Sequence, residues 1–260
     1  ISKETILEFK NINKKVIISQ WNEDPVMKSL KYSKNNLENI KNYSDIVDHN
    51  FITTDPNILK KQNININNFH FIFVPVDKNI ECFDVSKKKP IKDIFYAMSH
   101  GVNRAVLKKG KSDSRIHFLN NLVKKLDGID YDFYGFQNKE PIWGNDFYKA
   151  LINSKMGLNL SRGLPTKYYS SNRIASLMGN GLLTFVDKKT HLNHMFNKNE
   201  MIFYDNINDL SDKINFYKKN DKLRVKIASA GRKKYFNLFN ELKTTKYIIG
   251  KSLGNSTILY

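Results

Sequence analysis

The chain has 260 residues, 40% hydrophobic and 12% aromatic, which is enough for one large or two small α/β domains and argues against disorder. Its one cysteine, Cys82, excludes an internal disulfide framework and a multi-cysteine metal site; we expect a partly buried free thiol in a reducing compartment. No apolar run approaches the roughly 20 residues that span a bilayer. The polar opening, which lacks Met, does not resemble a signal peptide, and we expect an N-terminal part to precede it.

The formal charge of +18 suits nucleic acid, an anionic membrane surface or an anionic substrate. Most of the basic residues are lysines dispersed among Asn and Ile, a pattern typical of any solvated surface. Arginine is more informative, because its planar fork binds phosphate in a bidentate way that lysine cannot copy. The arginines are Arg104, Arg115, Arg162, Arg173, Arg224 and Arg232.

The first region of the chain reads as short strands with one helix between them. The expected elements are a strand over 15–21, a helix over 26–43, a strand over 50–54 and a strand within 68–77. The charged, proline-containing run over 84–93 is expected to be a linker.

The second region alternates strands with helices, which predicts a parallel sheet with right-handed crossovers. The expected strands are 93–98, 131–136, 155–161, 181–187 and 201–205, and the expected helices are 115–126, 145–154, 170–180, 191–196 and 208–238. In such a sheet, ligands bind beyond the carboxyl ends of the strands.

The loop after the first of these strands is a candidate anion site. It contains Ser99, His100 and Gly101, and a glycine there lets a ligand approach the backbone amides. Basic side chains follow it at Arg104, at Lys108 and, in the next helix, at Arg115. An ordinary βα turn with solvated bases is the alternative. Neither a dinucleotide fingerprint nor a Walker loop is present.

A stronger candidate lies between residues 158 and 187. A buried strand leads into a polar loop, and a helix follows with Arg173 in its first turn. A cation is unfavourable at a helix N-terminus by about 0.3–1 kcal/mol. The position makes sense if an anionic ligand binds there, whereas the alternative is that Arg173 pairs with a carboxylate or points to water.

The run from Arg173 to Gly181, RIASLMGNG, resembles the donor-binding segment of GT-B glycosyltransferases, and particularly the CgeB-type (spore-protein-like) family. In that family a strand and loop lead to an Arg-x-x-Glu-type helix start, then a small-residue turn and an apolar strand. The resemblance covers about residues 92 to 250, and the loop with Ser99, His100, Gly101 and Arg115 resembles the first loop of the same domain. Many relatives carry a ribose-binding glutamate where this chain has Ser176, so the nucleotide is left open.

The resemblance implies a GT-B-like α/β architecture of two Rossmann-like domains with parallel sheets. The implied divisions are residues 1–88 for the last part of an incomplete acceptor-side domain, 89–240 for the nucleotide-sugar-binding domain, and 241–260 for a C-terminal helix that packs back toward the first domain. The implied donor-binding residues are Ser99, His100, Gly101, Arg104, Lys108, Arg115, Phe136, Ser161, Arg162, Tyr168, Tyr169, Ser170, Ser171, Asn172, Arg173 and Ser176. The base is expected near Phe136 or Trp143.

Acidic side chains follow the first strand at Glu23 and Asp24, beside Trp21. A sugar can stack on Trp, and either carboxylate could remove the proton of an acceptor hydroxyl, so both are predicted to be catalytic. Ordinary turn and helix-cap chemistry is the alternative. His49 and Asp55 are weaker candidates.

No metal and no cofactor are expected. His191 and His194 have a spacing that two metal ligands could use, but no third ligand is evident, and no Asp-x-Asp pattern suggests a metal on a diphosphate. Arginines and helix amides would then neutralise the diphosphate.

The function expected is a cytoplasmic glycosyltransferase of bacterial polysaccharide or lipopolysaccharide synthesis. It would use a UDP- or GDP-linked sugar and a glycan or lipid-linked acceptor, bind no nucleic acid, and contact an anionic inner membrane peripherally. The alternatives are a basic, non-enzymatic module for nucleic acid or an anionic surface, and a degenerate transferase fold that only binds.

Overall fold

A computed structural model describes residues 1–26, 31–61, 63, 68–99, 114–161 and 163–255. The chain divides into two compact units. Unit 1 comprises Ile1–Pro75, Thr166–Ser171 and Leu238–Tyr260, and unit 2 comprises Val76–Pro165 and Asn172–Asn237. No helix among the described residues is both long and apolar enough to cross a membrane.

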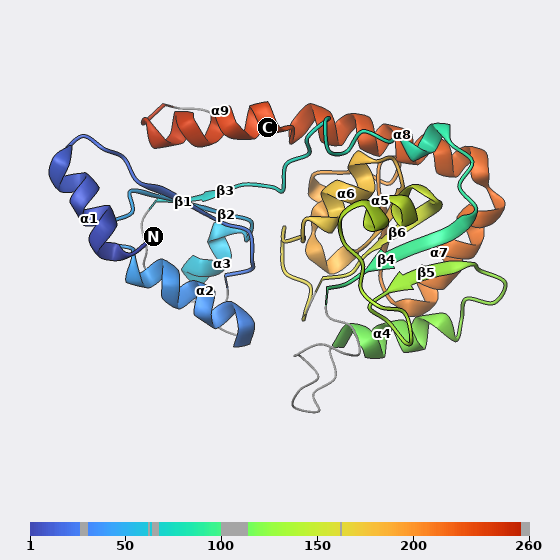
Figure 1. The fold of residues 1–260 in the computed structure, drawn as a ribbon. Coiled ribbons are helices and arrows are strands. Elements are labelled where there is room, and N and C mark those ends of the chain that lie inside the picture. The colour runs from blue at the N-terminus through green and yellow to red at the C-terminus, as the bar shows by residue number, and fades with distance from the viewer. Residues whose placement is uncertain (27–30, 62, 64–67, 100–113, 162, 256–260) are drawn as a thin grey trace. The chain divides into compact units, whose positions relative to one another are not determined.

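Unit 1 is built on a parallel sheet of three short strands in the order β1-β2-β3. The strands are β1 (Ser19–Asn22), β2 (His49–Ile52) and β3 (Phe69–Phe71), and the helices are α1 (Lys3–Ile12), α2 (Lys31–Asn42), α3 (Pro56–Lys61) and α9 (Glu241–Ser252). Leu37 and Ile40 of α2 and Leu59 of α3 pack with Ile52. On the other face of the sheet, Tyr247 of α9 contacts Phe51 edge-to-face at 6.2 Å (Figure 1). The sheet is therefore covered on both faces.

Unit 2 is built on a five-stranded parallel sheet in the order β5-β4-β6-β7-β8. The strands are β4 (Lys92–Ala97), β5 (Tyr131–Tyr134), β6 (Ser154–Asn159), β7 (Leu183–Asp187) and β8 (Ile202–Tyr204). The helices are η1 (Val85–Lys87), α4 (Ser114–Val123), α5 (Gly144–Ile152), α6 (Arg173–Gly179), η3 (Lys188–Thr190), η4 (Leu192–His194), α7 (Ile207–Lys219) and α8 (Asp221–Leu238).

Helices cover both faces of this sheet, which is why its strands are buried over most of their length. Leu119 and Leu122 of α4 and Leu210 of α7 pack on one face. Leu151 of α5 and Leu177 of α6 pack on the other (Figure 1). α6 lies so close to β6 that a Cβ on Gly157 would stand 2.4 Å from Cδ2 of Leu177.

The strand order of unit 2 places a topological switch point between β4 and β6. From β4 the chain moves outward to β5, crosses back to β6, and then moves outward the other way to β7 and β8. The chain therefore continues from β4 and from β6 toward opposite sides of the sheet. Open parallel sheets bind ligands at such a switch point, beyond the carboxyl ends of the strands.

Several expected elements differ from those observed. The predicted linker over 84–93 lies within unit 2, where Val85 is fully buried and β4 already begins at Lys92. The predicted helix over 191–196 is a single 3-10 turn, η4. Cys82 is exposed rather than partly buried. Helices α1 and α3 were not expected.

Candidate functional site

The guanidinium of Arg173 bridges the two strands that flank the switch point. Its Nε donates to the carbonyl oxygen of Ala97, the last residue of β4, at 2.8 Å. Its Nη1 donates to the carbonyl oxygen of Leu160, the residue after β6, at 3.0 Å. The sequence left open whether this side chain would pair with an acid or point to water; these two bonds hold it between the ends of β4 and β6.

The ring of Tyr96 packs against the face of the Arg173 guanidinium. The Arg173 Cζ lies 4.7 Å from the Tyr96 ring centroid, a cation–π distance. The Tyr96 hydroxyl donates to the same Leu160 carbonyl at 3.1 Å. Two partners of the guanidinium, Ala97 and Leu160, are neutral carbonyls, and these bonds orient its positive charge. A fixed cation at the carboxyl ends of parallel strands suits an anionic ligand.

A cavity of about 150 Å³ lies in unit 2 beside Leu160. Asn159, Asp187 and Tyr204 are the last residues of β6, β7 and β8. Ser114, Arg115 and Phe118 come from the first half of α4. Its lining is Ser114, Arg115, Phe118, Asn159, Leu160, Ser161, Gly163, Pro165, Asp187, Thr190 and Tyr204. We call it the strand-end cavity.

Two ionisable groups of the strand-end cavity have shifted pKa values. Burial raises the pKa of the Asp187 carboxyl, the Lys189 backbone N–H and charge oppose that shift, and Asp205 adds to it. Burial, followed by Asp187 and Tyr96, raises the pKa of the Tyr204 phenol. The phenol therefore stays a hydrogen-bond donor at any physiological pH.

Some predicted donor residues meet in unit 2. Arg173 contacts Ala97, two residues before the exposed Ser99, and Leu160, one residue before Ser161. Arg115 is the second residue of α4, is only 5% exposed and lines the strand-end cavity with Ser161. Ser176 is half-buried on α6, and its carbonyl accepts from the Asn180 side chain at 2.9 Å.

The loop between β6 and α6 supplies the other described candidates, and most of it belongs to unit 1. Tyr168, Tyr169, Ser170 and Ser171 lie in that unit, and Asn172 precedes α6 in unit 2. Tyr168 has a left-handed backbone with φ 62°, and its ring lies 5.7 Å from that of Phe71. The remaining candidates, His100, Gly101, Arg104, Lys108 and Arg162, lie outside the described residues.

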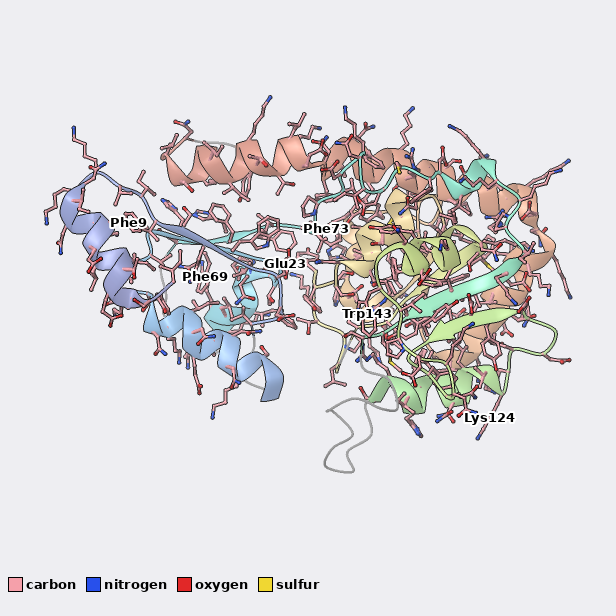
Figure 2. All side chains as sticks on the ribbon, in the orientation of Figure 1. Phe9, Glu23, Phe69, Phe73, Lys124 and Trp143 are labelled. Carbon is pink, nitrogen blue, oxygen red and sulfur yellow. The ribbon has the colours of Figure 1, made fainter. Side chains whose placement is uncertain are left out.

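The two aromatic candidates for the base differ in accessibility. Phe136 is 2% exposed and packs in the core against Phe133, so its ring offers no face to a ligand. Trp143 is 51% exposed and precedes α5 (Figure 2). Of these two side chains, only Trp143 is accessible enough for a nucleotide base to stack on it.

In unit 1, Glu23 and Asp24 are exposed just beyond β1 (Figure 2), and the Thr53 hydroxyl donates to the Glu23 carbonyl at 2.7 Å. Asp55 is buried and paired with Lys167 at 2.7 Å. Its burial would raise its pKa, but Lys167 and the Asn57 N–H more than offset this and lower it. His49 begins β2, at the opposite end of the strand from Asp55, and contacts His70 at 3.0 Å.

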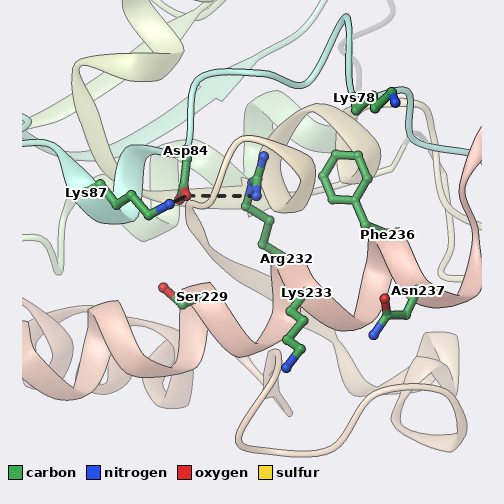
Figure 3. A pocket seen from close by; sticks show the side chains of 8 residues that line it. All are labelled: Lys78, Asp84, Lys87, Ser229, Arg232, Lys233, Phe236 and Asn237. Carbon is green, nitrogen blue, oxygen red and sulfur yellow. Dashed lines mark ion pairs between the residues drawn. The ribbon is translucent and has the colours of Figure 1, made fainter.

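A second hollow of unit 2, about 420 Å³, runs along α8 (Figure 3). Its lining is Lys78, Asp84, Lys87, Ser229, Arg232, Lys233, Phe236 and Asn237. Arg232 Nε donates to the carbonyl oxygen of Gly179, at the end of α6, at 2.7 Å, and Asp84 lies 3.8 Å from its Nη1. Because α6 runs antiparallel to the strands, its last residue lies near their amino ends. The basic groove therefore lies at the opposite end of the strands from Arg173. Its arginine fastens α8 to α6.

Among the described residues, no cluster of three or more His, Cys, Asp or Glu side chains could hold a metal ion. His191 and His194 are close, with ring centroids 5.6 Å apart, but they have no third ligand there. The strand-end residues Asn159, Asp187 and Tyr204 were not singled out from the sequence. A rule was available, since each ends a predicted strand or lies within it.

Solved structures resemble this fold over almost the whole chain. HepE of Anabaena in complex with UDP-glucose superposes with a TM-score of 0.67 at 10% identity, covering 97% of this chain and 77% of HepE. The fold is that of GT-B glycosyltransferases.

Two further structures share the GT-B fold at low identity. TarM matches with a TM-score of 0.62 and 17% identity, covering 96% of this chain and 52% of TarM, so the chain spans about half of that protein. An alpha-glucosyltransferase in complex with UDP-glucose and DNA containing an abasic site matches with a TM-score of 0.59 and 12% identity, covering 97% of this chain and 77% of that chain.

A sequence family supports the same assignment for unit 2. Residues 114–240, just under half of the chain, match a family described as glycosyl transferase-like. The comparison with curated protein sequences returned no relative. The narrower resemblance to the CgeB-type family stays a prediction.

Proposed function

We propose that this chain is the donor-binding part of a metal-independent glycosyltransferase that moves a sugar from a nucleoside-diphosphate donor to a hydroxyl of a glycan or lipid-linked acceptor. The observation that carries the proposal is the Arg173 guanidinium, held across the switch point of a GT-B sheet by Ala97 and Leu160. HepE, which has the same fold, was solved with UDP-glucose, so a UDP-linked sugar is the donor we favour over a GDP-linked one.

In this reaction the acceptor oxygen forms a bond to the anomeric carbon. The bond from that carbon to the diphosphate oxygen breaks, and its electron pair leaves with the diphosphate. Stabilising that negative charge is the main task of the enzyme, and a preorganised cation does so without reorganisation. Arg173 would supply the fixed charge. The acceptor proton would pass to a carboxylate, for which Glu23 and Asp24 are the candidates.

Helix α6 contributes less than the sequence suggested. It has only seven residues, Arg173–Gly179, so its dipole is short. The proposal therefore rests on the guanidinium rather than on the helix amides.

Calorimetric titration of UDP-glucose, a GDP-sugar and a CMP-sugar tests donor binding. We expect UDP-glucose to bind, and Arg173→Ala to weaken it at least about tenfold, because a charge-assisted contact to phosphate is lost. Arg232→Ala is the matched control: this arginine also donates its Nε to a carbonyl oxygen, at 2.7 Å, and lies 4.8 Å from an aromatic ring, that of Phe236.

Both variants should lower the melting temperature, but only Arg173→Ala should lower the affinity for UDP-glucose. Unchanged affinity in Arg173→Ala would remove the basis of the proposal. Release of UDP in the presence of an acceptor distinguishes a transferase from a fold that only binds. Its loss in Glu23→Ala or Asp24→Ala, with UDP-glucose affinity kept, would identify the base.

A further inference from the structure

The strand-end cavity contains a buried hydroxyl that none of the described residues uses as a hydrogen-bond partner. Tyr204 is 1% exposed, and its hydroxyl has no hydrogen-bond partner among the residues that the structure describes. A buried polar group without a partner costs about 1–3 kcal/mol. Tyr204 lines the strand-end cavity, so a ligand placed there could satisfy the hydroxyl.

Asp187 supplies an acceptor in the same cavity. One carboxylate oxygen accepts from the Lys189 backbone N–H at 2.8 Å. Among the described residues, no lysine, arginine or histidine forms an ion pair with this carboxylate. Its negative charge is therefore only partly compensated, and a carboxylate has lone pairs for further hydroxyl donors.

Apart from the Arg115 guanidinium, the rest of the lining is uncharged and suits one sugar ring. Phe118 and Leu160 offer apolar surface, while Asn159 and Thr190 add polar groups beside Asp187 and Tyr204. The volume, about 150 Å³, is below the roughly 300 Å³ at which pockets for drug-sized ligands begin, so it has room for a single ring. An acceptor carboxylate beside a donor phenol matches neighbouring sugar hydroxyls, which both donate and accept.

We propose that the strand-end cavity binds the sugar of the donor, with the Asp187 carboxylate accepting from a sugar hydroxyl and the Tyr204 hydroxyl donating to one, and that it selects an uncharged hexose. This rests on the proposed function. A sugar with its own carboxylate is disfavoured, because it would place a second negative charge beside Asp187. Asp187 and Tyr204 are thus specificity residues, whereas Arg173 serves the diphosphate.

The test compares UDP, UDP-glucose and UDP-glucuronate by calorimetry on the wild type, Tyr204→Phe and Asp187→Asn. The wild type should bind UDP-glucose more tightly than UDP, and UDP-glucuronate less tightly than UDP-glucose. Tyr204→Phe should lower the affinity for UDP-glucose roughly five- to tenfold, which is the effect of one lost hydrogen bond. Its affinity for UDP should be unchanged. Asp187→Asn should narrow the preference for UDP-glucose over UDP-glucuronate.

Stability gives a second readout that separates ligand binding from a structural role. Without ligand, Tyr204→Phe should unfold at the same or a higher denaturant concentration, because it removes a hydroxyl that has no partner in the described structure. Tyr217→Phe is the control, because Tyr217 is a half-buried tyrosine on α7 outside the cavity. It should change neither the affinity for UDP nor that for UDP-glucose.

The outcomes separate the two proposals. If UDP fails to bind the wild type, the proposed function fails. If UDP binds but UDP-glucose has the same affinity in the wild type and Tyr204→Phe, the sugar assignment is overturned and the proposed function stands. Equal binding of UDP-glucose and UDP-glucuronate to the wild type would overturn the selection of an uncharged sugar.

Discussion

At the scale of single residues, two charged side chains of unit 2 have different surroundings. Arg173 is half-buried at the carboxyl ends of the strands, where two neutral carbonyls accept hydrogen bonds from it. Asp93 lies at the amino end of β4, where Lys155 and Lys218 pair with it at 3.0 and 2.7 Å and the Asp130 N–H donates to it at 3.0 Å. The first arrangement orients a positive charge at the carboxyl ends of the strands, and the second neutralises a negative charge at their amino ends.

Asp93→Asn should therefore cost stability but not binding. Burial would raise the pKa of Asp93, but Lys218, the Asp130 N–H and Lys155 more than offset this and lower it. Asparagine removes the charge with which both lysines pair. We expect a loss of about 2–3 kcal/mol at pH 7, at or below the lower limit of the roughly 3–5 kcal/mol for broken buried pairs, because both lysines reach solvent.

The pH dependence of that loss has a definite sign. A carboxyl whose folded pKa is lowered stabilises the protein above its unfolded pKa of about 3.9, and this contribution disappears as the pH falls through the folded pKa. Urea unfolding should show a gap between wild type and Asp93→Asn at pH 7 that shrinks below about pH 4. A gap that is constant with pH would show that the ion cluster is not its cause.

At the scale of elements, the position of Arg173 depends on how α6 packs against β6. Gly157 has no side chain where Leu177, which is fully buried, approaches the strand. Gly157→Ala would push α6 outward, and we expect a cost of about 1–3 kcal/mol together with weaker UDP-glucose binding, since Arg173 begins α6.

A double-mutant cycle with Leu177→Ala checks this contact. Leu177→Ala alone should cost about 2–5 kcal/mol. Because it vacates the space that the new methyl group needs, the double variant should be less destabilised than the sum of the two single ones. Strict additivity in denaturant unfolding would mean that the two residues do not touch.

Sequence patterns predicted the elements of unit 2 well, because buried parallel strands and one-sided helices have distinct periodicities. Every strand from β4 to β8 and the helices α4, α5 and α6 lie where they were expected, with ends shifted by a few residues. They predicted unit 1 less well. The strand predicted over 50–54 ends at Ile52, and the unexpected α3 begins at Pro56, where Asp55 Oδ1 accepts from the Asn57 N–H at 3.0 Å. Asp followed by Pro is also a helix start.

The candidate site was predictable only in part, for a physical reason. The sequence places Arg173 at the start of a helix, but its partners at Ala97 and Leu160 depend on β4 and β6 being neighbours. That adjacency is a long-range property of the sheet. For the same reason the meeting of Arg115, Asp187 and Tyr204 in one cavity could not be predicted from local pattern.

At the scale of the whole molecule, the net charge of +18 leaves nucleic acid to be tested as a partner. For a non-specific cationic surface, we expect weak duplex binding that is lost between about 50 and 200 mM salt, because each phosphate contact releases counterions. UDP-glucose affinity should fall much less over that range. DNA binding that persists at the higher salt would favour a nucleic-acid function.

The central claim is that Arg173 holds the diphosphate of the donor at the switch point of unit 2. A crystal or cryo-EM map of the protein with UDP bound tests it most directly. The expected result is a phosphate oxygen within about 3 Å of the Arg173 guanidinium, beyond the ends of β4 and β6. Diphosphate density in the basic groove along α8, with none at Arg173, would contradict the claim.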